Sequence, residues 1–391
     1  MIKKKIQDLI HGYQDRIQFD QQTIIAKAPG RINLIGEHTD YNGGLVLPGA
    51  IDKYFYFILH PRKDSQINAY AADLNEKYEF TVDNLKRTNE LWVDFLIGIL
   101  IEFKNKGYVS SGFDCILSSD VPVGAGMSSS SALECAVLSA LNAHFKAGYS
   151  NWELIEMSKS SNHNFIGIKG GIMDQFASLF GQKDRVILLD CDSLQHRYFS
   201  IPENEYTWLL INTGVKHSHL TSGYNERVLE CQQGLNTIRK HFPQASNLSV
   251  VTDIKHIQHL TFPSEKVKRR ALYIIKENTR VKHFIEALHH SDFNKCGALL
   301  YASHDGLSNE YEVSCIELDY LVALLKDDED VSGSRMMGGG FGGCTINLVK
   351  RNSLNSIKQK VTKAYQNKFL IQAEFYDVKI SDGASVSILE L

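Results

Sequence analysis

The residues most able to do chemistry are concentrated in one polar segment, residues 28–44, which reads APGRINLIGEHTDYNGG. Arg31 offers a planar fork of hydrogen-bond donors, whereas Glu37 and Asp40 offer acceptors. His38 can act as either. This mixture suits a neutral ligand with many hydroxyl groups. Because the segment opens on Pro-Gly and closes on Gly-Gly, we expect a polar surface loop, where binding groups often lie. A solvated turn with a structural Arg–carboxylate pair is the alternative.

Glycines and serines dominate a second segment, residues 121–131, which precedes a predicted helix. Ala132, Leu133 and Ala136 begin an apolar stripe at helical spacing. Glycines let backbone N–H groups approach a ligand, and the first turn of a helix attracts anions. We therefore expect a phosphate group here. The segment lacks the Lys of a P-loop, and Ser129 stands where a dinucleotide-binding fingerprint needs glycine. A loop whose serines merely cap the helix is the alternative.

Two further segments carry candidate functional residues. Asp174 lies among apolar neighbours in residues 170–178, where a carboxylate is either a structural hydrogen-bond acceptor or a catalytic base. Five of the six residues 338–343 are glycine, which gives the unfolded chain a large conformational entropy. A purely structural loop rarely needs that many. Close approach of the backbone to a ligand, or several positive φ angles, would account for these glycines.

These segments together resemble one enzyme family. Residues 30–42 resemble the galactokinase signature, and galactokinases belong to the GHMP small-molecule kinases. Residues 122–130 and 333–343 resemble the second and third GHMP motifs, in the family order. Residues 171–176 resemble the galactokinase Gly-Ile-Met-Asp-Gln-Phe segment. The resemblance spans about residues 23–384, and it implies an α/β (α+β) GHMP kinase fold with mixed sheets, helices and an active site in the cleft between two domains.

The resemblance also implies roles for individual residues. Asp174 is the expected base for the anomeric hydroxyl of a sugar, or else orients that hydroxyl. Arg31 would keep Asp174 ionised and neutralise charge on the transferred phosphoryl group. The expected sugar contacts are Glu37, His38, Thr39, Asp40, Gly171 and Tyr224. The expected ATP phosphate cradle is Gly124, Ala125, Gly126, Met127, Ser128, Ser129 and Ser130.

The expected magnesium site departs from the family pattern. The resemblance makes Ser130 one Mg²⁺ ligand, but the position of the family's Mg²⁺-binding Glu is occupied by Asn162. An amide oxygen carries no charge, and a hard cation prefers carboxylates. Either Asn162 binds the metal weakly, for example through water, or the metal depends on Ser130 and the nucleotide.

The activity that the resemblance implies is ATP-dependent phosphorylation of D-galactose at its C1 hydroxyl, as in galactose catabolism. A kinase for a related sugar, N-acetylgalactosamine or L-arabinose, is one alternative, because few contacts distinguish these substrates. A catalytically weak sugar sensor is another. The serine-rich loop and Asp174 argue against the sensor, and Asn162 is the feature in its favour.

Composition bounds the remaining properties. The 391 residues suffice for two or three domains, and the net charge of −3 gives no electrostatic reason for a nucleic-acid or membrane partner. The seven cysteines include no CxxC pair, which favours reduced thiols. Because the chain has neither a signal-peptide pattern nor an apolar run of 18 residues, we expect a cytoplasmic protein. We expect a monomer.

Secondary-structure elements must position these side chains. The apolar spacing predicts an amphipathic helix over 2–17 and a helix over 90–103. The family resemblance implies that an aromatic residue of the second helix lies near the adenine, so Trp92 is either that contact or an ordinary core residue. Residues 230–325 read as mainly helical, and 304–319 as support for the substrate site. Strands are expected over 23–28, 51–59, 113–117, 185–190 and 208–212. The resulting domains are 1–205 and 206–391, with the last strand able to return to the first domain.

Overall fold

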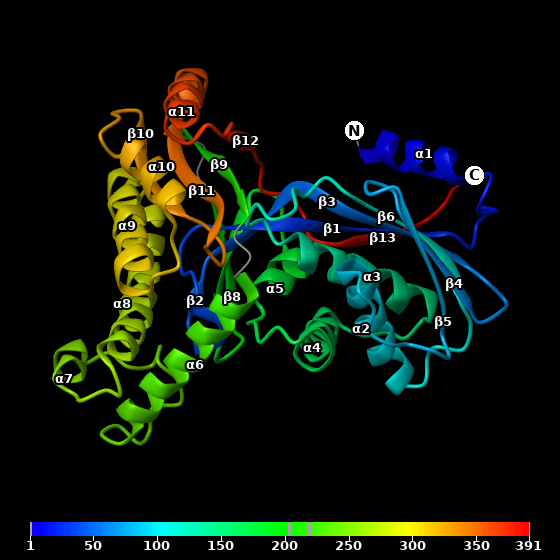
Figure 1. The fold of residues 1–391 in the computed structure, drawn as a ribbon, viewed down its shortest axis with the longest axis horizontal. Helices are drawn as coiled ribbons and strands as arrows, with labels where there is room; N and C mark the ends of the chain where they lie inside the picture. Colours follow the sequence, from blue (N-terminus) through cyan, green and yellow to red (C-terminus); the bar gives the residue numbers. More distant parts are fainter. Residues whose placement is uncertain (1, 202–204, 217–219, 391) are drawn as a thin grey trace.

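The computed structural model describes residues 2–201, 205–216 and 220–390. Runs of strands and runs of helices follow one another along the chain, and the strands form three sheets (Figure 1). The elements up to residue 200 are α1 (Ile2–Tyr13), β1 (Ile24–Asn33), β2 (Leu45–Val46), β3 (Pro48–Pro61), β4 (Gln66–Ala71), β5 (Glu76–Thr81), α2 (Leu91–Asn105), β6 (Phe113–Ser119), α3 (Ser129–His144), α4 (Asn151–Ser161), α5 (Met173–Phe180), β7 (Arg185–Asp190) and β8 (His196–Ser200).

The later elements are β9 (Tyr206–Lys216), α6 (Leu220–Arg239), α7 (Ile254–Gln258), α8 (Glu265–His289), α9 (Phe293–Asp305), α10 (Ile316–Lys326), β10 (Val331–Met336), β11 (Gly342–Lys350), α11 (Leu354–Phe369), β12 (Glu374–Asp377) and β13 (Ser385–Ile388). The expected helices and strands are thereby confirmed in type, with ends shifted by a few residues. No helix among the described residues is both long and apolar enough to cross a lipid bilayer.

The largest sheet has six strands in the order β13-β1-β3-β6-β4-β5. Both faces of this sheet are covered at strand β3. Successive side chains of a strand point to opposite faces of the sheet. Phe57 and Leu59 face the main core, whereas Tyr56 and Ile58 join the cluster under α1. Helices α3 and α5 pack on β1 and β3 from the first face, and α2 and α4 pack on α3. Figure 1 shows α1 alone on the opposite face.

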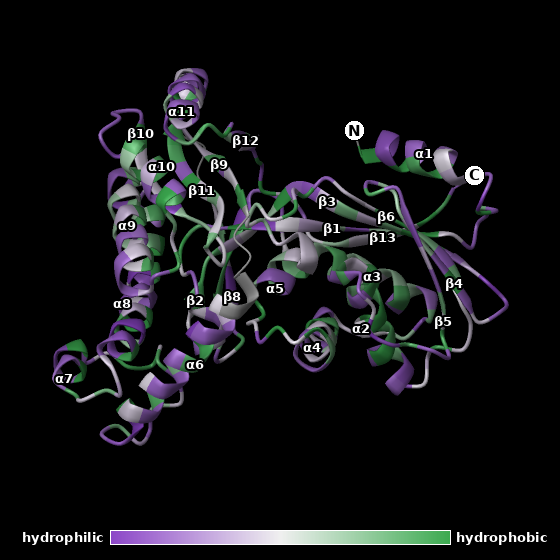
Figure 2. Cartoon of the chain, in the orientation of Figure 1, coloured by the Kyte–Doolittle hydropathy of each residue, from purple (hydrophilic) through white to green (hydrophobic). Residues whose placement is uncertain are grey.

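The second large sheet, β10-β11-β9-β12, carries helices α9 and α10. Helix α8 packs against both α6 and α9 and forms the outer wall at the left of Figure 1. Figure 2 shows α2, which is enclosed by other elements, mostly green, and α11, at the edge of the molecule, mostly purple. The burial of each helix therefore follows its hydropathy.

One hydrophobic core crosses the expected domain boundary at residue 205. It includes Leu96 and Ala136 on one side and Leu210, Phe284 and Ile346 on the other. Strand β9 begins at Tyr206 in the second large sheet, and β13 returns to pair with β1. The division into 1–205 and 206–391 stays a proposal, because the packing is continuous across it.

The expectation of a polar surface loop over residues 28–44 is wrong in its surface position and for residues 28–33, which belong to a strand, whereas residues 34–44 do form a loop. Strand β1 continues through Asn33, and Arg31, Glu37 and His38 are each at most 4% exposed. The pairing of β1 with β3 shifts register between Pro29 and Arg31. Such bulges redirect side chains and often lie beside active sites. The polar groups of this segment therefore face the interior of the molecule.

Candidate active site

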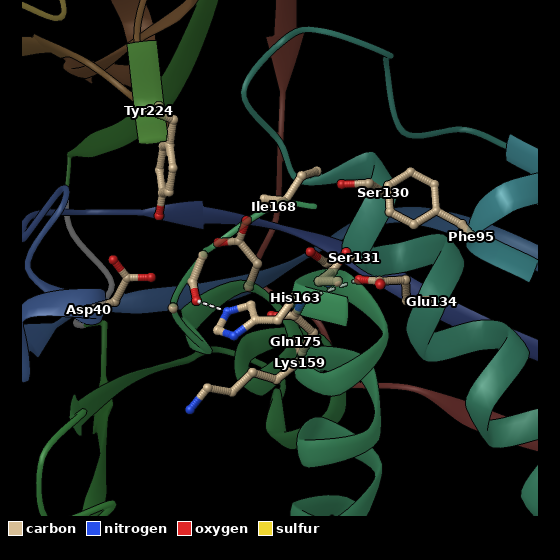
Figure 3. Close-up of a pocket in the computed structure, with 15 residues that line it drawn as sticks. Asp40, Phe95, Ser130, Ser131, Glu134, Lys159, His163, Ile168, Gln175 and Tyr224 are labelled. Carbon is tan, nitrogen blue, oxygen red and sulfur yellow. Dashed lines mark hydrogen bonds between the residues drawn. The ribbon is translucent and has the colours of Figure 1, made fainter. Parts of the chain in front are cut away.

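Two adjoining cavities bring the predicted site residues together. The inner cavity is lined by Arg31, Glu37, His38, Asp40, Met173, Asp174, Tyr224, Gly338 and Gly339. The outer cavity shares Asp40, Asp174, Tyr224 and Gly339 with it and extends to Ser130 and Glu134 on α3. Figure 3 shows Asp40 and Tyr224 at one end of the outer cavity and Ser130 and Phe95 at the other. Asp174 thus lies where the two cavities meet.

The carboxylate of Asp174 is held from two sides. Arg31 Nε donates to Oδ1 at 2.9 Å, and Ser128 Oγ donates to Oδ2 at 2.6 Å. Asp174 lies in the first turn of α5, and its side chain remains 31% exposed. A carboxylate fixed at a cavity wall with some exposure can reach a ligand hydroxyl. The arrangement suits a group that accepts or orients a proton.

Arg31 connects residues 28–44, here called the sugar segment, to residues 121–131, here called the glycine–serine loop. Its guanidinium also donates to the carbonyl oxygen of Gly126, and its backbone N–H donates to Met127 O at 3.1 Å. Burial lowers the pKa of Arg31, but the charges of Asp174 and Glu37 outweigh that effect and raise it. A buried, permanently charged group therefore stands beside the carboxylate of Asp174.

The serine that precedes α3 does not cap the helix with its side chain. Ser128 has φ 60° and ψ 49°, a left-handed conformation, and its hydroxyl makes no capping hydrogen bond. It donates to Asp174 instead. The expectation that Ser128 cradles phosphate is not tested, but the structure gives its side chain a different partner. The unusual backbone conformation turns this hydroxyl toward the carboxylate.

Glu37 of the sugar segment is buried where that segment meets the third glycine motif, residues 333–343. Its Oε1 accepts hydrogen bonds from both terminal nitrogens of Arg335 at 3.2 Å and from Gly338 N at 2.8 Å. Arg335 is fully buried and also donates to the carbonyls of Asn33 and Leu34. Arg335 is therefore a structural residue. Glu37 also lines the inner cavity.

Asp40 has the pKa most relevant to function. Burial, together with the charge of Asp174, raises the pKa of Asp40 to about 7. Gly171 makes the position of this carboxylate possible, since a Cβ at residue 171 would lie 2.1 Å from Asp40 Oδ2. A glycine is needed here for close approach. Asp40, Gly171 and Tyr224 therefore form one wall of the outer cavity, as Figure 3 shows for the two labelled side chains.

His38 is neutral and is held from behind. Burial and the positive charge of Arg227 lower its pKa to about 3. Nδ1 lies 2.8 Å from Tyr41 Oη, which lies 2.8 Å from Tyr311 Oη. Nε2 is buried without a hydrogen-bond partner among the described residues, and the ring centroid lies 5.6 Å from that of Tyr224. One ring nitrogen is thus left to serve a ligand in the inner cavity.

Thr39 lies outside both cavities. Its hydroxyl oxygen lies 2.8 Å from Gly36 O and 2.7 Å from Leu45 O, and its side chain is fully buried. A single hydroxyl proton directed at backbone carbonyls holds the turn that carries His38 and Asp40. A sugar contact by Thr39 stays a prediction that these hydrogen bonds do not favour.

The glycine–serine loop divides into a packed part and a cavity-facing part. Ala125 and Met127 are fully buried, and Gly124 and Gly126 adopt positive φ angles of 77° and 74°. The serines that begin α3 line cavities: Ser130 borders the outer one, and Ser129 borders an apolar cavity beyond it. A free helix N-terminus at this point favours an anionic ligand.

The third glycine motif approaches protein backbone more closely than expected. A Cβ at Gly340 would lie 2.1 Å from Val313 O, and a Cβ at Gly126 would lie 2.9 Å from Met337 O. Gly338 and Gly340 have positive φ angles, 85° and 83°. The positive φ angles that the sequence offered as one explanation are confirmed, whereas the close approach seen here is to the protein's own backbone, and close approach to a ligand stays a prediction. Gly339 lines both cavities.

The polar end of the outer cavity contains the predicted residue Asn162 and also Glu134, which sequence reasoning missed. Asn162 directly follows α4 as its C-cap and begins a π-helical turn, Asn162–Ile166, a feature often found at functional sites. Beside it lies Glu134 on α3, which is 1% exposed. Burial raises the pKa of Glu134 to about 7, although neighbouring polar side chains, Asn162 first among them, lower it. The available signal was its spacing, one helical turn after Ser130.

An apolar cavity adjoins Ser129 and Ser130. Leu91, Trp92 and Phe95 of α2 border it, and Trp92 Nε1 donates to Glu76 Oε2 at 2.8 Å. The exposed hydrophobic residues Leu74 and Val123 also line it. An apolar recess next to a helix N-terminus has the form expected for an aromatic base attached to phosphates.

Residues 304–319 acquire definite roles. Tyr311 Oη contacts Tyr41, and His304 Nδ1 accepts a hydrogen bond from Met336 N at 3.2 Å. Val313 O accepts from Phe341 N at 2.7 Å. The segment therefore supports both the turn that carries His38 and the third glycine motif, as its assignment to substrate-site support anticipated.

Three family descriptions match the chain. Residues 16–61 match the galactokinase galactose-binding signature, residues 94–182 match the GHMP kinases N terminal domain, and residues 284–367 match the GHMP kinases C terminal description. All three fall on segments that the site uses.

Individual relatives cover nearly the whole chain. A galactokinase of Thermotoga neapolitana is 37% identical over 91% of this chain and 98% of its own length. A galactokinase of Staphylococcus carnosus is 38% identical over 93% and 95%. The crystal structure of Lactococcus lactis galactokinase complexed with galactose superposes with a TM-score of 0.92 at 30% identity, covering 97% of this chain and 99% of the other. A Methanococcus jannaschii mevalonate kinase, at 16% identity and a TM-score of 0.64 over 92% and 98%, shares the fold.

Proposed function

The chain belongs to the galactokinases, a family of GHMP kinases, and from this premise we infer that it transfers the γ-phosphoryl group of ATP to the C1 hydroxyl of D-galactose. The product is galactose 1-phosphate. The observation that carries the proposal is the position of Asp174, fixed between Arg31 and Ser128 where the inner cavity meets the outer one.

The proposed chemistry follows from this position. Galactose in the inner cavity would place its C1 hydroxyl within hydrogen-bond reach of Asp174, which accepts or orients the proton. The γ-phosphoryl group would arrive from the outer cavity. Phosphoryl transfer depends mainly on positioning and charge stabilisation, and Arg31 supplies a fixed positive charge beside the reacting atoms.

Sugar recognition is proposed for the polar groups around the inner cavity. Glu37 and Asp40 accept hydrogen bonds from sugar hydroxyls, and neutral His38 offers Nε2. Tyr224 presents an apolar ring beside a hydroxyl, which suits one face of a sugar. Gly171 leaves room for Asp40. A matching set of donors and acceptors strongly rejects ligands that leave buried polar groups unpaired.

Nucleotide binding is proposed for the outer and apolar cavities. The loop Gly124–Ser130 would cradle the phosphates, with the base in the apolar cavity beside Trp92 and Phe95. Ser130 and Asn162 fit Mg²⁺, since both offer hard oxygen ligands at the polar end of the outer cavity. Bound with ATP, this cation would neutralise phosphate charge.

A panel of sugars tests the function. Purified protein is incubated with ATP, several Mg²⁺ concentrations and D-galactose, N-acetylgalactosamine or L-arabinose, and sugar phosphates are detected by ³¹P NMR. We expect galactose 1-phosphate as the main product. Preferred turnover of another sugar would replace the substrate assignment, and no turnover of any sugar at any Mg²⁺ concentration would leave a sensor.

We also propose a monomer in a reducing compartment, the cytoplasm. All seven cysteines are free, which supports the compartment. Light scattering during size-exclusion chromatography would detect any stable oligomer.

A further inference from the structure

Three carboxylates line the outer cavity: Asp40, Glu134 and Asp174. Asp174 is bonded to Arg31 at 2.9 Å and to Ser128 at 2.6 Å. Asp40 lies at the far end, beside Tyr224 (Figure 3). Glu134 lies on α3 itself, and among the described residues it is not bonded to Arg31 or Ser128 as Asp174 is.

Glu134 is a buried carboxyl group with spare hydrogen-bonding capacity. It is 1% exposed, and its Oε2 accepts from Gln175 Nε2 at 3.1 Å. Oε1 is buried and makes no hydrogen bond of good geometry. Burial raises the pKa of the carboxyl group, but Asn162 and Ser158 lie close enough to lower it by hydrogen bonding. No ion pair involves Glu134 among the described residues. Burial of a carboxylate without a counter-charge is costly. An unpaired carboxyl beside a ligand cavity therefore indicates a cationic partner that arrives with the ligand.

The sequence positions of the neighbours support this partner. Glu134 lies four positions after Ser130 on α3, so the two side chains lie on the same face of the helix. Asn162 lines the same cavity and supplies an amide oxygen without charge. Figure 3 shows the Glu134 carboxyl group close to Ser131 and Gln175, on the side of the cavity where Ser130 lies.

We propose that Glu134 supplies the anionic oxygen ligand for the divalent cation that accompanies the nucleotide, next to Ser130 and Asn162. Mg²⁺ sites in phosphoryl-transfer enzymes typically combine one or two carboxylates with substrate phosphates and water. Glu134 provides the charge that Asn162 lacks. The assignment rests on the proposed function, because it requires a bound nucleotide.

Metal affinity tests the assignment directly. Free Mn²⁺ is titrated by electron paramagnetic resonance in the presence of ADP, with the unsubstituted protein, Glu134→Gln and the control Glu156→Gln. Glu156 lies on the exposed side of α4, so its substitution makes the same chemical change away from the cavity. We expect Glu134→Gln to weaken Mn²⁺ binding at least tenfold. Metal-free ADP binding should stay within twofold.

Moving the charge gives a second, independent readout. Asn162→Glu restores a carboxylate in the same cavity, so the double variant Glu134→Gln/Asn162→Glu should recover most of the Mn²⁺ affinity. If Glu134→Gln does not fold, Glu134→Asp keeps the charge but retracts the oxygens, and should weaken Mn²⁺ binding severalfold. Unchanged Mn²⁺ affinity in the folded variants would overturn the assignment. If galactose is still phosphorylated in that case, the proposed function stands and only this inference fails.

Discussion

Asp174 is the single side chain on which the proposed chemistry depends most. The hydrogen bond from Arg31 fixes one carboxylate oxygen, and the hydrogen bond from Ser128 fixes the other. Neither contact encloses the carboxylate completely, since its side chain stays 31% exposed. It is therefore both oriented and able to meet a substrate hydroxyl.

Replacement of Asp174 by Asn should separate catalysis from binding. The amide keeps the shape but accepts no proton, so turnover should fall by roughly 10²- to 10⁴-fold. Galactose affinity, measured by calorimetry, should change by less than about threefold. Asp192→Asn on the exposed surface is the control. Turnover within tenfold of the unsubstituted protein would remove Asp174 from the proton-accepting role.

The pKa of Asp40 predicts a pH dependence. Asp40 holds its proton up to about pH 7 in the folded protein, whereas an unfolded Asp loses it near pH 4. The folded state thus binds more protons between these values, and the stability of the sugar-free protein falls as pH rises through them. Charge-assisted hydrogen bonds from sugar hydroxyls favour the carboxylate.

Galactose should therefore bind more tightly as pH rises through about 7, with release of protons. Calorimetry in two buffers of different ionisation enthalpy measures this release. Asp40→Asn should abolish it. A galactose affinity that is independent of pH between 6 and 8 in the unsubstituted protein would show that Asp40 loses its proton outside this pH range or does not contact the sugar.

The sequence could predict which residues meet here but not how each is used. Motif order brought Arg31 and Asp174 to one site, and the structure pairs them. The partner of Ser128 was not predictable, because a left-handed backbone at a non-glycine residue leaves no local signal. Glu134 was missed because a charged residue within an apolar helix stripe reads as a surface position. Its burial depends on α4 and α5, which lie far away in sequence.

Among the secondary-structure elements, the turn after α9 connects the sugar site with the second half of the chain. The Tyr311 hydroxyl lies 2.8 Å from that of Tyr41 and 3.1 Å from Cys231 Sγ. Tyr41 in turn contacts His38 Nδ1. A neutral imidazole carries one proton, and the state of Nδ1 determines whether Nε2 donates or accepts. This chain of hydroxyls therefore controls what His38 presents to the ligand.

Tyr311→Phe should change sugar binding more than catalysis. It removes one hydroxyl from a buried chain and leaves the oxygen of Tyr41 with one partner fewer, at a cost of about 1–3 kcal/mol in unfolding free energy. We expect the KM for galactose to rise severalfold while kcat stays within twofold. The ¹⁵N chemical shifts of the His38 ring should show mixed tautomers. Unchanged shifts with an unchanged KM would limit Tyr311 to packing.

The glycine motifs show why element boundaries were predicted better than element contacts. Five glycines in residues 338–343 marked a place of close approach, but not the surface approached. That surface includes Val313 O and the loop at Gly126, both distant in sequence. Single-sequence patterns report the local backbone, whereas such contacts depend on how separate elements pack.

Among the described residues, a buried ion pair joins the first and second halves of the chain. Arg335, on the strand that leads into the third glycine motif, meets Glu37 of the sugar segment, and both are at most 2% exposed. The common hydrophobic core crosses between the same halves. The two halves should therefore unfold together.

Arg335→Met tests this coupling. Loss of the guanidinium leaves Glu37 buried without its ion-pair partner, so the unfolding free energy should fall by about 3–5 kcal/mol in a urea titration. Adding Glu37→Gln removes the uncompensated charge and should recover part of the loss. A loss below 1 kcal/mol for the single variant, or two separate unfolding transitions, would contradict the assigned role of this pair.

Strand β1, near the N-terminus, pairs with β13, the last strand of the chain to be synthesised. Ile24 pairs with Ile388, so the strand that carries Arg31 receives its outer neighbour only after residue 388 has left the ribosome. Until then β1 presents an unpaired edge of N–H and C=O groups to other nascent chains. Ribosome stalling or premature termination upstream of β13 would release a chain that contains every loop of the site but has an unpaired sheet edge. We expect chaperones to bind such a chain, and we do not expect it to bind sugar.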